Sequence, residues 1–218
     1  MKNTSLKTIL EKTKKLKNVG QYSNATKLLN DNYSRFKKNT HFLATLAHSY
    51  ILQNEYQTAS SLIKKAKTID PNCRFVCWNE IRLLIKNKDL SSAIQLAKKC
   101  YKLYPDDAEG LVIIGACYRA SHKYQESLRF LKKALHIDQN NPEAIVNIGL
   151  IKIIKNDKIG ACRDLTRAFE IKPVIKEIWD LLIKLKIELL QFDDAIKVLN
   201  KILLIEPTEK NTFLIWDY

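Results

Sequence analysis

The sequence predicts an all-α fold in which about six copies of one helical hairpin follow one another along the chain. Similar segments recur at one constant spacing and begin at Leu62, Leu96, Phe130, Asp164 and Val198. A proline or a glutamine follows each segment at the same interval, at Pro71, Pro105, Gln139, Pro173 and Pro207. The 218 residues include only five glycines and five prolines, whereas Leu, Ile, Lys and Ala are abundant and favour helices joined by short connections.

The constant spacing sets the frame of the repeats. Upstream of each proline slot stands a small residue, and the same slot can be traced into one further copy: Ala25, Ala59, Ala93, Ser127, Ala161 and Ala195. Small residues are expected where two helices approach most closely, because a large side chain there would force the axes apart. The predicted repeats span 6–39, 40–73, 74–107, 108–141, 142–175 and 176–209, after a flexible N-terminus at 1–5.

The repeats keep the pattern to different degrees. The first has Thr13 and Asn32 in small slots and Lys12 in an apolar slot, so we expect it to be a solvated end cap. In the third and sixth repeats, Ile81 and Ile183 stand where a small residue is expected. In the third repeat, Ala97 replaces a large residue on the second helix, so volume can be exchanged between the facing helices at little net cost. The sixth repeat has no such compensation, because Ile202 also stands where alanine is usual, and we expect wider helix separation there.

The fourth repeat keeps the pattern best, with Leu111, Ile114, Gly115, Tyr118, Tyr124, Ser127, Leu131 and Ala134. The second follows it with Leu43, Leu46, Ala47, Tyr50, Tyr56, Ala59, Ile63, Ala66 and Pro71. In these residues and in the length of its repeat, the chain resembles the tetratricopeptide repeat (TPR) family. The resemblance implies a right-handed superhelical solenoid whose first helices line a concave groove that binds peptides or protein segments.

Charge and cysteine content bear on the partners. A formal net charge of +14 raises the alternatives of nucleic acid as partner or of lysines that only solvate helix faces. The N-terminus has charges spread through it and no continuous apolar stretch, so we expect no membrane partner. The odd number of five scattered cysteines suits reduced thiols and a cytoplasmic protein.

No catalytic or metal-binding pattern emerges from the sequence. The five glycines form neither a dinucleotide-binding nor a phosphate-binding loop, and the four histidines lack the spacing of a zinc protease. Cys73 and Cys77 are four residues apart but have no second pair of ligands, so core packing is the favoured role. We therefore expect a protein that is not an enzyme and needs no cofactor or metal.

The family resemblance places a set of side chains in the groove: His48, Trp78, Asn79, Arg82, Arg119 and Asn147. The resemblance assigns the two asparagines to hydrogen bonds with the backbone of a bound peptide. Trp78 follows the residue in the tryptophan slot, so it is expected to face the groove as an apolar anchor; packing between neighbouring helices is the alternative. Arg82 and Arg119, in adjacent repeats, are expected to converge on one carboxylate.

These observations favour a non-enzymatic scaffold that binds a protein or peptide segment, with an acidic segment as one version of the ligand. A second interpretation is the N-terminal repeat region of a larger enzyme, such as a glycosyltransferase or sulfotransferase. A third is RNA binding through a basic convex face formed by Lys64, Lys65, Lys98, Lys99, Lys132 and Lys133. The apolar residues 210–218 either cap the last hairpin or begin a further region.

Overall fold

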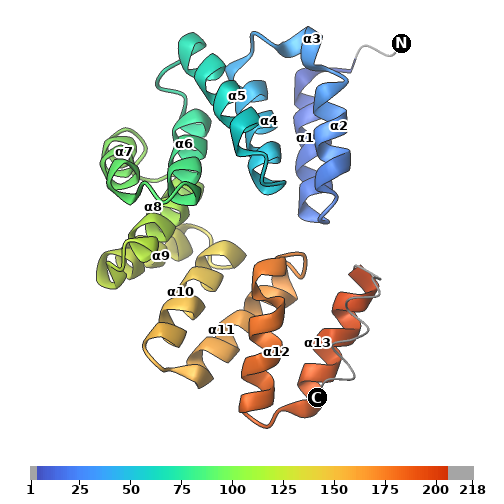
Figure 1. The fold of residues 1–218 in the computed structure, drawn as a ribbon, viewed down its shortest axis with the longest axis vertical. Coiled ribbons are helices and arrows are strands. Elements are labelled where there is room, and N and C mark those ends of the chain that lie inside the picture. The colour runs from blue at the N-terminus through green and yellow to red at the C-terminus, as the bar shows by residue number, and fades with distance from the viewer. Residues whose placement is uncertain (1–3, 206–218) are drawn as a thin grey trace. The chain divides into compact units, whose positions relative to one another are not determined.

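The computed structural model describes residues 4–205, and within that range the chain forms α-helices and one 3₁₀ helix, with no strand (Figure 1). The predicted segment 210–218 and the slot at Pro207 lie outside the described residues. Each of the predicted repeat ranges contains a pair of consecutive helices. The pairs are α1 (Leu6–Asn18) and α2 (Tyr22–Asn30), α4 (Thr40–Leu52) and α5 (Tyr56–Ile69), α6 (Arg74–Lys86) and α7 (Leu90–Leu103), α8 (Ala108–Ala120) and α9 (Tyr124–Ile137), α10 (Pro142–Ile154) and α11 (Lys158–Ile171), and α12 (Trp179–Glu188) and α13 (Phe192–Ile205). A 3₁₀ turn, η1 (Lys176–Ile178), precedes α12.

The chain divides into two compact units within the predicted array. The first unit ends at Phe130 and the second begins at Leu131, so the boundary falls inside α9. A buried cluster in the first unit joins side chains of α1, α2, α4, α5 and α6, among them Phe42 and Leu46. A buried cluster in the second unit joins α10 to α13, among them Leu165 and Leu182. Each unit therefore has apolar packing of its own.

Small residues lie where the helices of a hairpin meet, as the pattern predicts. The alanines of these slots are fully buried at Ala25, Ala59, Ala66, Ala93, Ala134, Ala161 and Ala168. In the fourth repeat the slot holds Ser127, whose hydroxyl donates to the backbone oxygen of Gly115 at 2.7 Å. This bond ties α9 to α8 and satisfies a hydroxyl that would otherwise be costly to bury.

The turn inside every hairpin has the same backbone conformation. One residue per turn has a positive φ between 59° and 77°: Gly20, Asn54, Lys88, His122, Asn156 and Leu190. The next amide bonds to a carbonyl five residues back, as Glu55 does to Tyr50 at 2.9 Å and Gln191 to Lys186 at 2.8 Å. This is the Schellman ending of a helix, which satisfies its last carbonyls and reverses the chain.

The second helix of the first repeat is broken, unlike its counterparts. It stops at Asn30, and a short helix, α3 (Tyr33–Phe36), follows after two turn residues. Asn32 stands at the slot that holds Ala66 one repeat later, and its Nδ2 donates to the Leu28 carbonyl oxygen at 2.9 Å. Asparagine side chains compete for helix backbone groups in this way, which accounts for a break at this position.

Candidate functional site

The predicted groove residues lie on the first helices of their hairpins. His48 is on α4, Trp78 and Arg82 are on α6, and Arg119 is on α8, all in the first unit. Asn147 lies on α10 in the second unit, where its Nδ2 donates to the Glu143 carbonyl oxygen at 2.8 Å. The candidate site is therefore described from the first unit alone.

Trp78 corrects one prediction, because its side chain is 0% exposed and cannot present a face to a ligand. The indole packs edge-on against Tyr104, with ring centroids 5.9 Å apart. It also lies against α8 at Gly110, where an added Cβ would come within 2.2 Å of the ring. The missing side chain of Gly110 makes room for the indole between α6 and α8, so Trp78 is a core residue.

Asn79 and Arg82 are brought together, but within a network of the protein's own groups. The Asn79 Nδ2 donates to the Ala44 carbonyl oxygen at 2.7 Å, which links α6 to α4. The Asn79 Oδ1 accepts from Arg82 Nη1 at 3.1 Å, and Arg82 Nη2 pairs with Glu109 Oε1 at 2.7 Å. Both ends of the buried amide are thus engaged, and Asn79 orients Arg82 instead of presenting its amide to a ligand.

The pKa of Glu109 reflects the charges around this network. Burial would raise the pKa of its carboxyl group, but the charge and the hydrogen bond of Arg82 hold the pKa below its usual range. The charges of Lys17 and Arg74 act in the same direction. Cations from α1 and α6 therefore act together on one carboxylate of α8.

An aromatic stack lies beside these charges. The rings of His41 and Phe75 are parallel, with centroids 4.1 Å apart, and the guanidinium carbon of Arg74 lies 4.7 Å from the Phe75 centroid. Arg74 also pairs with Asp107 at 3.2 Å. Burial, followed by the charges of Arg74 and Lys17, lowers the pKa of His41, so its ring is largely neutral at pH 7.

This stack was not among the predicted site residues, although the sequence contains a signal for it. His41, Phe75 and Glu109 are separated by one repeat length each and open the first helices of three successive repeats. Equivalent positions in adjacent repeats lie side by side, so a ring at one such position can reach a ring at the next.

Arg119 and His48 lie further along the same helices. Arg119 is ten residues beyond Glu109 on α8, about 15 Å along the axis at 1.5 Å per residue. Arg82 is held at Glu109, and the expected convergence of Arg82 and Arg119 on one carboxylate of a ligand stays a prediction. Burial lowers the pKa of Arg119. The His48 Nδ1 lies 3.4 Å from Lys17 Nζ.

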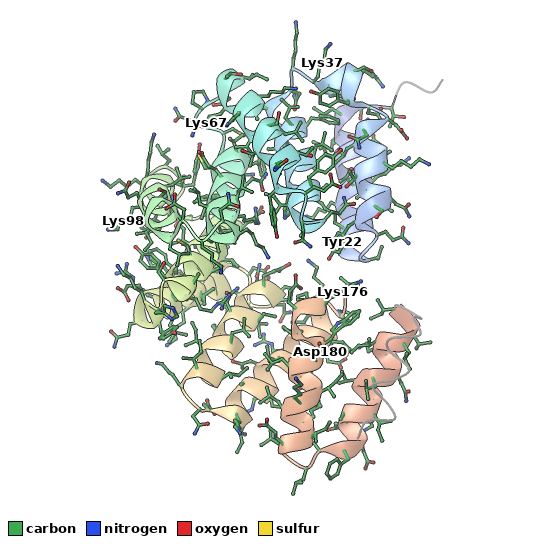
Figure 2. The ribbon with its side chains drawn as sticks, in the orientation of Figure 1. Tyr22, Lys37, Lys67, Lys98, Lys176 and Asp180 are labelled. Atoms are coloured by element: carbon green, nitrogen blue, oxygen red, sulfur yellow. The ribbon has the colours of Figure 1, made fainter. Side chains whose placement is uncertain are left out.

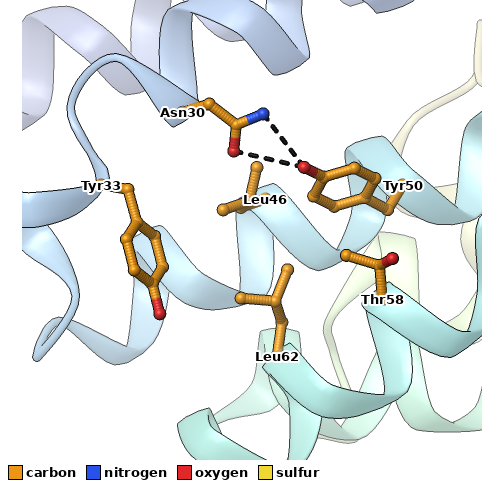
Figure 3. A pocket seen from close by; sticks show the side chains of 6 residues that line it. All are labelled: Asn30, Tyr33, Leu46, Tyr50, Thr58 and Leu62. Carbon is orange, nitrogen blue, oxygen red and sulfur yellow. Dashed lines mark hydrogen bonds between the residues drawn. The ribbon is translucent and has the colours of Figure 1, made fainter.

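A shallow hollow of about 210 Å³ lies at the broken helix of the first repeat (Figure 3). Figure 3 shows the rings of Tyr33 and Tyr50 on either side of Leu46, with Leu62 and Thr58 below. The Asn30 amide and the Tyr50 hydroxyl bond to each other, with Asn30 Nδ2 donating at 3.0 Å. Two polar groups of this hollow, the Asn30 amide and the Tyr50 hydroxyl, are thus engaged with each other.

The lysines of the second helices are exposed, as the pattern predicts. Lys64 and Lys65 on α5 and Lys98 and Lys99 on α7 all lie in the solvent, as do Lys132 and Lys133 on α9. Lys98 extends away from the ribbon (Figure 2). Lys67, on α5, instead pairs with Glu80 of α6 at 2.7 Å.

These features define a class, an all-α protein built of consecutive helical hairpins of one constant length. Two family profiles, both described as tetratricopeptide repeat, match residues 40–73 and 84–147. The matched segments are therefore tetratricopeptide repeats, as the sequence resemblance predicts.

Solved structures support the same fold. The chain superposes on a thermophilic TPR protein of Thermus thermophilus with a TM-score of 0.69 and 17% identity, covering 82% of this chain and 97% of that one. The APC/C hetero-tetramer Cut9-Hcn1 gives a TM-score of 0.72 at 17% identity, over 96% of this chain and 42% of that one. The type IV pilus biogenesis factor PilW gives a TM-score of 0.63 at 16% identity, over 95% of this chain and 96% of that one. The predicted all-α repeat solenoid is confirmed.

One curated relative is similar in sequence, the BBSome complex member BBS4 homolog of Drosophila melanogaster. It is 26% identical over 96 residues, which are 44% of this chain and 20% of the relative. The match thus spans about a fifth of the relative's length. Within residues 4–205, no helix has the length and apolar content to cross a membrane, and no group of His, Cys, Asp and Glu forms a cluster that could hold a metal ion.

Proposed function

We propose that this chain is a non-enzymatic interaction scaffold that binds an acidic segment of a partner protein on the first helices of its first unit. A tetratricopeptide repeat fold supports a role in protein–protein interaction in general, and the curated relative is named as a member of a complex. The finer proposal rests on the surface that α4, α6 and α8 build around Arg82.

The held guanidinium of Arg82 is the observation that carries the proposal. Its bonds to Asn79 and Glu109 use two of the five N–H donors of an arginine. The side chain is fixed before a ligand arrives, so less conformational entropy is lost on binding. The remaining donors suit a carboxylate of the partner, and Arg74 and Lys17 add positive charge nearby.

The stacked rings of His41 and Phe75 supply the apolar part of the same surface. A ligand that combines an acidic residue with a neighbouring apolar or aromatic residue would use both features. Aromatic groups beside arginine are frequent anchors of protein interfaces. The proposed partner segment is therefore acidic and partly apolar, and it replaces the ligand anchored on Trp78 that the sequence predicts.

The test uses fluorescent peptides of equal length, in acidic, neutral and basic sets, each with and without an aromatic residue. The double variant Arg74→Gln, Arg82→Gln removes two charges from the proposed surface. Lys64→Gln, Lys65→Gln removes the same two charges from the exposed face of α5 and is the matched control. We expect acidic aromatic peptides to bind the wild type, and to bind the Arg variant at least about tenfold more weakly, with little change in the control.

Two results would contradict this proposal. An equal loss in both variants would mean that the peptides respond only to net charge. Binding of single-stranded RNA at physiological salt that is lost with the lysine variant alone would favour the alternative of a polyanion partner, and its affinity would then fall steeply with added salt.

A further inference from the structure

The third hairpin holds two cysteines at a pair of slots that are apolar or amide in every other repeat. One slot is the tryptophan slot of the first helix, and the other is the small slot of the second helix that holds Ala66 in the second repeat. In the other repeats the two slots hold Ile9 and Asn32, Leu43 and Ala66, Leu111 and Ala134, Ile145 and Ala168, and Trp179 and Ile202. In the third they hold Cys77 on α6 and Cys100 on α7.

The repeat brings these two slots together inside each hairpin. Leu43 and Ala66 belong to one buried cluster of the first unit. In the second unit, the pairs of the fifth and sixth repeats likewise share one cluster. The two cysteines are therefore neighbours for the same reason that a large residue meets a small one elsewhere in the array.

The two thiols are in direct contact, because a side-chain hydrogen bond joins Cys77 to Cys100. Cys100 is 0% exposed, whereas Cys77 is 6% exposed and is the thiol that a small molecule can reach. The hydrogen bond lowers the pKa of Cys77, and the same bond together with burial raises the pKa of Cys100. Cys77 is thus the better nucleophile of the pair.

The other cysteines have different surroundings. Burial raises the pKa of Cys117 to about 11, so its thiol stays protonated at pH 7. The Cys162 Sγ donates to Gln191 Oε1 at 3.7 Å. Cys73 lies half buried at the start of α6, one helical turn before Cys77.

We propose that Cys77 and Cys100 form a reversible disulfide when the folded chain meets a peroxide, and that this bond links α6 to α7. The Cys77 sulfur attacks a peroxide oxygen, the O–O bond breaks, and a sulfenic acid and one water form. The Cys100 sulfur then attacks the Cys77 sulfur, the S–O bond breaks, and a second water leaves with the Cys100 proton. The two sulfurs lose two electrons in total, and these reduce hydrogen peroxide to water.

The cross-link closes a loop over residues 77–100, so it restrains the unfolded chain and favours the folded third hairpin. A dithiol reductant would restore both thiols by exchange. The inference does not rest on the proposed peptide surface.

The test treats the folded full chain with hydrogen peroxide in the absence of denaturant and maps the products by peptide mass spectrometry without reduction. We expect a pair of peptides linked through Cys77 and Cys100, which dithiothreitol separates again. The link should form at least about tenfold faster than Cys117 is oxidised.

A variant separates the two chemical steps. Cys100→Ala removes the second thiol and supplies the side chain that this slot has in the second, fourth and fifth repeats, so the fold should be kept. Dimedone, which traps sulfenic acids, should then label Cys77 in the variant and leave it unlabelled in the wild type. Cys117→Ala makes the same change at another fully buried cysteine of the first unit, and the link should form there as in the wild type.

The map of the wild type decides the proposal even where a variant does not fold, which circular dichroism shows. A disulfide between Cys73 and Cys77, or between two chains, would overturn the proposal, since the contact across the hairpin would not be the one that reacts. Failure to find any linked pair in the folded wild type would also overturn it, as would a link between Cys77 and Cys100 that forms only in urea.

Discussion

At the scale of single residues, Trp78 shows why the site could be predicted only in part. The repeat pattern places Trp78 one residue after the slot that holds the core tryptophan, and this assignment of sequence positions is correct. Its direction is decided by a residue 32 positions away, because Gly110 leaves the space that the indole fills. The pairing of a large residue in one repeat with glycine in the next breaks the repeat pattern, so a consensus could not reveal it.

This pairing gives a prediction for Gly110→Ala. An alanine gains up to about 1 kcal/mol of helix propensity over glycine, but the new Cβ would lie 2.2 Å from the Trp78 ring, and the overpacking costs about 1–3 kcal/mol. The free energy of unfolding should therefore fall, as urea titration followed by circular dichroism would measure. In a Trp78→Phe background the ring is smaller, so the same change should cost less. Additive effects of the two substitutions would show that they do not meet.

For the charged part of the site, the residue types could be predicted from the sequence, but their hydrogen-bond and ion-pair partners could not. Arg82 and Asn79 were identified from their places in the repeat, and both take part in the network on α6 and α8. That Asn79 uses its amide on Ala44 and Arg82 could not be foreseen, because it depends on the distance between α4 and α6. His41 and Phe75 were within reach of sequence reasoning, since their spacing of one repeat predicts neighbouring side chains.

At the scale of elements, the helical hairpins follow from the repeat pattern, and their turns follow from a second pattern that overlaps it. Gly20, Asn54 and Asn156 are residues that tolerate a positive φ, and they mark the turns of the first, second and fifth hairpins. Of the other three turns, one uses His122, a residue type also enriched at positive φ, and two use Lys88 and Leu190, which carry no such signal. In these turns, the packing of the two helices holds the turn residue at a positive φ although that conformation is unfavourable for it.

Leu190 is the most unfavourable of these turn residues, and it gives a prediction for Leu190→Gly. The left-handed conformation costs a residue with a Cβ about 1–2 kcal/mol, whereas glycine adds about 0.4–1 kcal/mol of unfolded-chain entropy. Since Leu190 is 75% exposed, little packing is lost. The variant should be more stable by several tenths to about 1 kcal/mol in urea unfolding.

The control for this change is Leu204→Gly, in the last described turn of α13. That residue is also highly exposed, but its backbone is helical. Glycine there should destabilise the chain by up to about 1 kcal/mol, the cost of glycine in a helix interior. If both variants lower the stability, the turn at Leu190 is not strained.

At the scale of the whole molecule, the sequence predicts one continuous array, and the structure separates it into two compact units. A periodic sequence cannot reveal such a division, because every repeat has the same marks of packing on both sides. What distinguishes the units is the content of their buried clusters, one built on α4 with its neighbours and the other on α10 to α13. In a protein of repeats, stability is local and passes between nearest neighbours.

The division predicts that a cavity in one unit affects that unit first. Leu182→Ala empties a fully buried position of the second unit, and Leu43→Ala does the same in the first. Each substitution should cost about 2–5 kcal/mol in the unit that holds it. Hydrogen exchange should then accelerate over residues 131–205 for Leu182→Ala and over residues 4–130 for Leu43→Ala, with a smaller change in the other unit. The two variants are matched in chemistry and burial, so a difference in pattern reports position alone. Uniform loss of protection across both units in either variant would mean that the chain unfolds as one cooperative body, and that the boundary within α9 has no energetic meaning.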